Sequence, residues 1–131
     1  MQNELVTPYL KIWIEGGILC CVYADKLSID LEVAKKCVAD RIAFVEGRSY
    51  ACMIDMRGIH MVSKEARDYF ADEGSTLITA GALIIGNPLT RMLGNIFLQV
   101  SKPKVPLRLF SDEKNAMQWL KKQEYKSAVL K

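Results

Sequence analysis

Five residues whose side chains suit acid–base, anion-binding or phosphate chemistry lie within ten positions of one another: Asp55, Arg57, His60, Ser63 and Lys64. They follow an unbroken apolar run over residues 51–54, which is typical of a central strand buried on both faces. Arg57, Gly58 and His60 are expected in the loop after this strand, and Ser63 stands where a helix N-cap belongs. Open α/β sheets bind ligands where the carboxyl end of a strand faces a helix N-terminus. These residues are therefore the candidate interaction and anion site.

The same residues contain an Asp, a His and a Ser, the side chains of a hydrolase triad. In that reading His60 would be the general base, with Asp55 and Ser63 beside it. The sequence has no GxSxG elbow, and a serine that caps a helix is poorly placed to attack a substrate. We therefore predict no catalytic residue: Asp55 braces the loop, and Arg57 is either exposed to solvent or binds an anion.

The four cysteines do not have the spacing of a metal site. There is no CxxC pair, and the single histidine has no ligand spacing to them. Neighbouring residues of a strand face opposite sides of the sheet, so Cys20 and Cys21 cannot readily share one metal. Together with Cys37 and Cys52 they lie in apolar runs. We predict free, buried thiols, and neither a metal nor another cofactor.

Composition limits the class of protein further. The chain has 131 residues, half of them hydrophobic, and a formal charge of +3, so we expect one domain over residues 1–131. Acidic and basic residues alternate without a basic stripe, which argues against nucleic-acid binding. No run approaches the ~18–20 apolar residues of a membrane span, and the start lacks the pattern of a signal peptide. The expected location is the cytoplasm.

The elements expected before the candidate site are a hairpin and a helix. Residues 9–14 and 18–23 predict two strands joined by a glycine turn at residues 15–17. Asp30 is the expected cap of a helix that Gly47 ends. The predicted buried face of this helix comprises Leu31, Ala34, Val38, Ile42 and Val45. Its predicted solvent face comprises Lys35, Asp40, Arg41 and Glu46.

Alternating helices and strands are expected after the site. The elements are a helix from Ser63 to about Glu73, a strand at 78–85, a helix from Pro88 or Leu89, a strand at 105–110 and a helix capped by Ser111 or Asp112. The two prolines of the last strand favour a sheet edge. The stripe on the third helix is expected to pack in the core and comprises Met92, Leu93, Ile96, Phe97 and Val100. Residues 125–131 are expected to be a frayed tail.

The predicted order is ββαβαβαβα. An opening antiparallel hairpin followed by strand–helix alternation implies an α/β fold with a mixed sheet and parallel crossovers.

Three stretches of this pattern resemble the STAS fold of the bacterial anti-sigma factor antagonists, in its SpoIIAA-like branch. They are YLKIWIEGGILCCVY at the start, IDMRGIHMVSKEA in the centre and VPLRLFSDEKNAMQWLKK at the end. The resemblance covers nearly the whole chain. It implies a bacterial, cytoplasmic, non-enzymatic module that regulates a protein partner. The same branch is similar in shape to Sec14-type lipid-binding domains, which implies an apolar ligand as the alternative.

The antagonist family carries a phosphorylatable serine at the start of the helix after the central strand, and its phosphorylation blocks docking to a kinase. Asp55 matches the acid that ends the family's strand. Counted from Asp55, the phosphoacceptor position holds Lys64, and Ser63 comes one residue earlier. Ser63 is thus the candidate phosphoacceptor, but the shifted register argues against an intact switch.

Three functions follow as hypotheses. The first is an interaction module acting through residues 55–64, the second is a carrier of a small apolar or lipid ligand, and the third, disfavoured, is a hydrolase using His60. Homodimer formation is a further expectation, because Trp13 and its apolar neighbours on the hairpin could pair edge to edge. None of these functions requires insertion into a membrane.

Overall fold

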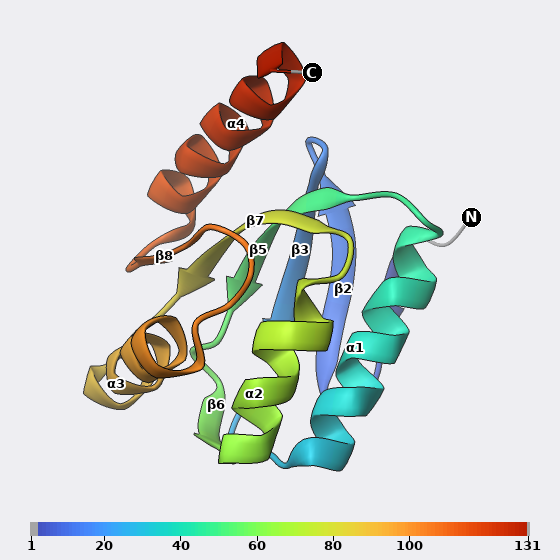
Figure 1. Cartoon of the computed structure of the whole chain (residues 1–131). Helices are drawn as coiled ribbons and strands as arrows, with labels where there is room; N and C mark the ends of the chain where they lie inside the picture. Colours follow the sequence, from blue (N-terminus) through green and yellow to red (C-terminus); the bar gives the residue numbers. More distant parts are fainter. Residues whose placement is uncertain (1–2, 131) are drawn as a thin grey trace.

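The computed structural model describes residues 3–130, with side chains described up to residue 126. Its centre is a six-stranded sheet with the strand order β1-β2-β3-β5-β7-β8 (Figure 1). The strands are β1 (Glu4–Val6), β2 (Leu10–Glu15), β3 (Ile18–Tyr23), β5 (Tyr50–Asp55), β7 (Ile78–Ile84) and β8 (Leu107–Phe110). A second sheet pairs β4 (Leu27–Ile29) with β6 (Ile59–Val62) in parallel.

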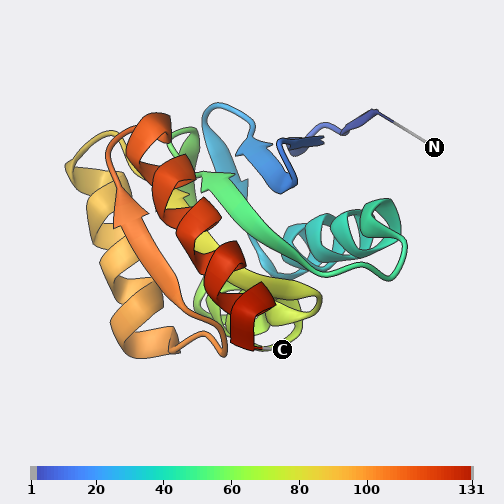
Figure 2. The ribbon, with the colours of Figure 1, turned by 90° about the horizontal axis from the view of Figure 1, so that it is seen from above.

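The helices form a layer on each face of the main sheet. They are α1 (Leu31–Val45), α2 (Lys64–Asp72), α3 (Pro88–Ile96) and α4 (Glu113–Leu130), with a 3₁₀ turn at Glu73–Ser75 and a π turn, η2, at Phe97–Ser101. From β3 onward the neighbouring strands are parallel, in chain order. Crossovers of one hand along a sheet in chain order place α1, α2 and α3 on the same face. Only α4 lies on the opposite face (Figures 1 and 2).

The predicted order ββαβαβαβα is therefore confirmed for the main sheet and its helices, apart from the additional first strand β1. The hairpin of β2 and β3 is antiparallel, and its turn carries Gly16 and Gly17 at φ of 57° and 79°. A two-residue turn with both φ values positive matches the twist of the strands, and glycine adopts it without steric cost. The remaining pairs from β3 to β8 are parallel, as expected of strand–helix alternation.

Three short strands, β1, β4 and β6, were not predicted. β1 covers the free side of β2, so the open edges of the main sheet are β1 and β8, and β2 is not an edge. Pairing of two copies through an edge would thus use β1 or β8 and not the strand of Trp13. β6 contains His60, for which the sequence predicted a loop. β8 does lie at an edge, as its prolines indicated.

Helix α1 begins as predicted, but its C-cap is Glu46, in the left-handed conformation, one residue before the predicted Gly47, and one of its faces was assigned incorrectly. The Asp30 side chain accepts a hydrogen bond from the Val33 backbone N–H, and Gly47 adopts a φ of 80° just after the helix. Arg41, expected on the solvent face, is only 6% exposed. Leu31 and Ile42, expected in the core, are half-buried. The buried residues are Ala34, Cys37, Val38, Arg41 and Val45.

The third predicted stripe is only partly buried. Leu93 lies in the core, whereas Met92 is 51% and Val100 68% exposed. Val100 is exposed because a π turn follows Ile96. The wider hydrogen-bond spacing of this turn shifts the following residues out of the α-helical phase. The core stripe of this segment therefore ends near Phe97.

Helix α4 packs across the face opposite the other helices. Ala116 and Leu120 are fully buried there against Ala51, Met53 and Ala82. Asp112 caps α4, since its carboxylate accepts a hydrogen bond from the Asn115 backbone N–H at 2.8 Å. The backbone stays helical to Leu130, so the segment expected to fray from residue 125 continues α4, and Lys131 is outside the described residues. No helix within residues 3–130 is both long and apolar enough to span a membrane.

Candidate functional site

Asp55 and Arg57 form a charge cluster with Glu113 at the carboxyl end of β5. The Asp55 Oδ1 accepts from the Arg57 backbone N–H and from its Nε, both at 3.0 Å. The Asp55 Oδ2 accepts from the Arg57 Nη2 at 2.7 Å, and the same Nη2 donates to Glu113 Oε1 at the start of α4. Asp55 therefore braces the loop, as predicted.

In this cluster the Arg57 guanidinium donates hydrogen bonds to two carboxylates, those of Asp55 and Glu113. Hydrogen bonding to Asp55, followed by its charge and the contact with Glu113, raises the pKa of Arg57 above its ordinary value. Asp55 is nearly buried, while the Arg57 side chain is 43% exposed. The arrangement ties the β5 loop to the α4 N-terminus, and it leaves little of the positive charge for an external anion.

Ser63 caps α2 as predicted. Its hydroxyl oxygen accepts a hydrogen bond from the Ala66 backbone N–H at 3.1 Å, an interaction worth about 1 kcal/mol. Lys64 donates to Asp68 one turn along the helix, and this hydrogen bond raises the pKa of Lys64. His60 is exposed on β6 and makes no hydrogen bond within the described side chains. The structure thus brings Asp55 and Arg57 together, and no hydrogen bond joins them to His60, Ser63 or Lys64 among residues 3–126.

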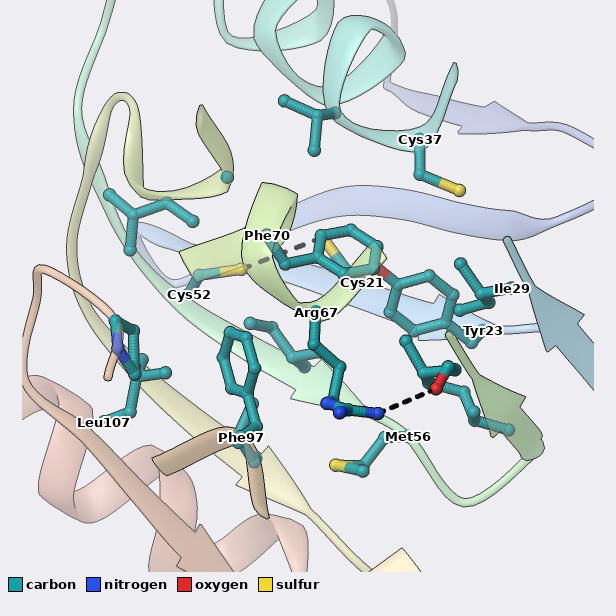
Figure 3. A pocket seen from close by; sticks show the side chains of 18 of the residues that line it. Cys21, Tyr23, Ile29, Cys37, Cys52, Met56, Arg67, Phe70, Phe97 and Leu107 are labelled. Atoms are coloured by element: carbon teal, nitrogen blue, oxygen red, sulfur yellow. Dashed lines mark hydrogen bonds between the residues drawn. The ribbon is translucent and has the colours of Figure 1, made fainter. Parts of the chain in front are cut away.

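A cavity of about 120 Å³ lies elsewhere, between the sheet and the layer of α1, α2 and η2. Sequence reasoning did not identify it. Figure 3 shows its lining, contributed by strands, helices and loops that are far apart in the sequence. The labelled apolar and aromatic residues are Cys21, Tyr23, Ile29, Cys37, Cys52, Met56, Phe70, Phe97 and Leu107.

Two arginines also line this apolar cavity. Arg41 from α1 donates through Nη2 to the Gly74 carbonyl at 3.1 Å, and its Nη1 is buried without a hydrogen-bond partner. Arg67 from α2 donates through Nη1 to the Val62 carbonyl at 3.1 Å, and its Nε is likewise buried without a partner. Figure 3 shows the Arg67 side chain reaching into the space among the apolar groups. Guanidinium groups in such surroundings ordinarily pair with an anion.

One sequence signal could have located Arg41. Ala34, Val38, Arg41 and Val45 are separated by four, three and four residues, the spacing of one buried helical face. Assigning Arg41 by its charge rather than by its spacing placed it on the wrong side. Arg67 follows the N-cap of α2 by four residues, and nothing in the sequence alone directs it inward.

The cysteines are free and buried, as predicted. Cys21, Cys37 and Cys52 lie on the cavity side of the sheet, whereas Cys20 packs toward α4. Burial raises the pKa values of the Cys20 and Cys37 thiols to about 12, so these groups are protonated and poorly nucleophilic at neutral pH. No group of three or more His, Cys, Asp or Glu side chains in the described part of the chain could hold a metal ion.

The fold defines the class of protein. A solved structure from Shewanella loihica PV-4, described as an uncharacterised protein of the DUF3478 family with a SpoIIAA-like fold, superposes with a TM-score of 0.61. The match covers 85% of this chain and 91% of that one, at 13% sequence identity. The chain therefore has a SpoIIAA-like, STAS-type fold, as its sequence indicated, and a likeness at this identity concerns the fold alone.

The family is shown by a sequence match over residues 12–124 to the model described as "Domain of unknown function (DUF7793)". The chain belongs to this family. No curated protein matches the sequence.

Proposed function

We propose that this chain is a non-enzymatic binding module that holds a small apolar molecule in the cavity between its sheet and α1, α2 and η2. The cavity is the observation that carries the proposal. Small-molecule sites are concave and mostly apolar with a few polar groups, and this cavity of about 120 Å³ is lined mostly by apolar side chains together with two arginines. An engineered apolar cavity of about 150 Å³ admits benzene, which sets the scale at about six non-hydrogen atoms.

The chemistry of the described residues supports binding rather than catalysis. A nucleophile needs an adjacent base or a lowered pKa, and the Cys20 and Cys37 thiols have the opposite shift. Ser63 is engaged as a helix cap, and the Asp55 carboxylate is engaged with Arg57. His60 is thus without an orienting acid or a nucleophile in hydrogen-bond contact.

Filling the cavity tests this proposal. Cys21 lines the cavity, and we expect Cys21→Met to extend into it and to lower the affinity for benzene at least tenfold. The free energy of unfolding should stay within about 1 kcal/mol of the parent, because methionine adapts to irregular space. Titration with benzene, followed by the NMR shifts of the Ile29 and Leu83 methyl groups, measures the binding.

The neighbouring cysteine provides a matched control. Cys20 faces the packed layer beneath α4 and does not line the cavity. Cys20→Met should therefore retain benzene binding and lower the free energy of unfolding by about 1–3 kcal/mol through overpacking. A ligand cavity would be contradicted if benzene does not change the methyl shifts of the parent protein, or if it changes those of Cys21→Met to the same extent.

A second candidate function is the docking of a protein partner, for which the exposed methionines are the supporting observation. Met61 on β6 is 59% exposed and Met92 on α3 is 51% exposed, and these two elements contact each other. Met61 lies within residues 55–64, the stretch for which the STAS resemblance implied an interaction face. Methionine is common at adaptable binding surfaces because its side chain is flexible and polarisable.

Charge substitution on this face tests the docking function. If a partner binds here, Met61→Lys combined with Met92→Lys should remove a stoichiometric partner that co-purifies with the parent from its native host. Val100→Lys is the control, since Val100 is at least as exposed as the two methionines but lies on η2. A partner retained by the double variant, or lost equally with Val100→Lys, would place docking elsewhere.

A further inference from the structure

We propose that the ligand of the cavity is a small amphipathic organic anion, such as a short-chain carboxylate, whose charged group is bound by Arg41 and whose hydrocarbon part lies among the apolar side chains, with Arg67 as a second guanidinium on the lining. This inference rests on the proposed binding function and adds the chemical class of the ligand to it.

The burial of Arg41 is the first argument. Arg41 is only 6% exposed and lines the cavity, and its Nη1 has no hydrogen-bond partner. A buried guanidinium stays charged, because its pKa is too high for it to lose a proton in a protein. Burying a charge without a counter-charge is costly, so the position favours a bound anion.

The absence of an internal counter-charge is the second argument. Among residues 3–126, neither Arg41 nor Arg67 forms an ion pair; each donates only to one backbone carbonyl. Asp40, next to Arg41 in the chain, pairs with Lys36 through Oδ1 at 3.0 Å, and its Oδ2 is buried without a hydrogen-bond partner, so this carboxylate does not bind Arg41. Asp55, the one nearly buried acid, is engaged by Arg57. The protein thus supplies carboxylates to Arg57 and none to the two arginines of the cavity.

The third argument is that the arginines come from two helices packed on each other. α1 contributes Arg41 and α2 contributes Arg67, and both side chains reach the same apolar space. The unused donors are Nη1 of the first and Nε of the second. The backbone partners of the two arginines, Gly74 and Val62, lie on either side of α2, so each guanidinium offers a carboxylate its own binding position. Arg41 is the more deeply buried of the two, and the rest of the lining suits a hydrocarbon chain. The volume limits that chain to a few carbons.

Three probes that differ in charge test the ligand class on the full-length protein. Pentanoate, 1-pentanol and pentylammonium share one hydrocarbon chain. We expect pentanoate to bind at least tenfold more tightly than 1-pentanol, and pentylammonium to bind more weakly than both. The NMR shifts of the Ile29 and Leu83 methyl groups report entry into the cavity, and the Arg67 Nε–H resonance reports contact with the anion.

Substitution of the arginines assigns the charge to them. Arg41→Met should lower pentanoate affinity at least tenfold and leave 1-pentanol affinity within about twofold. Replacing a buried charge with an apolar side chain of similar length is often neutral for stability, so this variant should fold. Arg67→Met is the independent second variant, and we expect a smaller loss of pentanoate affinity than for Arg41→Met, because Arg67 is less deeply buried. Arg48→Met, at an exposed position just beyond α1, is the control and should change neither affinity.

The outcomes separate the two proposals. If no probe and no benzene enters the cavity of the parent protein, the binding function itself fails. If benzene and 1-pentanol bind but pentanoate binds no better than 1-pentanol, the function stands and the anionic class is wrong. If pentanoate is preferred, yet Arg41→Met and Arg67→Met both keep that preference, the assignment of the charge to these arginines is overturned.

Discussion

Gly58→Ala should lower the free energy of unfolding by about 3 kcal/mol, one of the largest single effects expected in this chain. A Cβ at Gly58 would stand 2.5 Å from the Ala24 carbonyl oxygen and 2.9 Å from its carbonyl carbon. Both atoms belong to the backbone, so no side-chain rotation can relieve the contact. The Gly58 carbonyl also accepts from the Leu27 N–H at 3.0 Å, so movement would disturb the pairing of β4 with β6.

Gly74→Ala is the matched control for this prediction. A Cβ there would meet Phe70 side-chain atoms at 3.4 Å, close to an ordinary contact, and the φ of Gly74 is not positive. We expect its free energy of unfolding to lie within about 0.5 kcal/mol of the parent. Urea unfolding followed by circular dichroism measures both variants. Equal effects of the two substitutions would contradict the close backbone approach at Gly58.

The order of the main elements could be predicted because long apolar runs and helix caps are local signals. Asp30, Ser63 and Asp112 each occupy the predicted position before a helix, and the structure shows each carboxylate or hydroxyl accepting a backbone N–H. The strands β1, β4 and β6 have only three or four residues. Such segments are too short for alternation to show, and they form because a partner strand lies alongside.

The candidate site was only partly predictable because a cavity depends on packing between elements distant in sequence. Asp55 and Arg57 are two residues apart, so their contact is local and the bracing role could be inferred. Arg41 and Arg67 meet the same space only after α1 and α2 pack against the sheet. Residue type favours a solvent-exposed arginine, and the tertiary structure overrides this preference.

Met92 is the opposite case: an apolar residue expected in the core that the tertiary structure leaves exposed. Its type and spacing predicted a core position on α3, yet the sheet beneath the helix is covered by Leu93 and partly by Leu89 and Phe97. The width of a buried stripe depends on how the helix sits on its neighbour, which periodicity does not specify.

The free energy of unfolding should fall steeply at alkaline pH, because of the buried thiols. Burial raises the pKa values of Cys20 and Cys37 from 9.0 to about 12, whereas in the unfolded chain they ionise near their ordinary value. Below pH 9 both states keep the protons, and this contribution to stability is fully present. Between pH 9 and 12 only the unfolded chain releases them, so each thiol lowers the free energy of unfolding by about 1.4 kcal/mol per pH unit.

A variant without the two thiols isolates this effect. Cys20→Ala combined with Cys37→Ala should be less stable than the parent at pH 8, because buried volume is lost. Its free energy of unfolding should then decline less steeply, by about 2–3 kcal/mol per pH unit between pH 10 and 11. Urea unfolding under a reducing agent at several pH values gives both slopes. Parallel slopes would mean that these thiols ionise equally in both states. The surroundings of Cys20 on β3 and of Cys37 on α1 would then be less protected from water than their burial indicates.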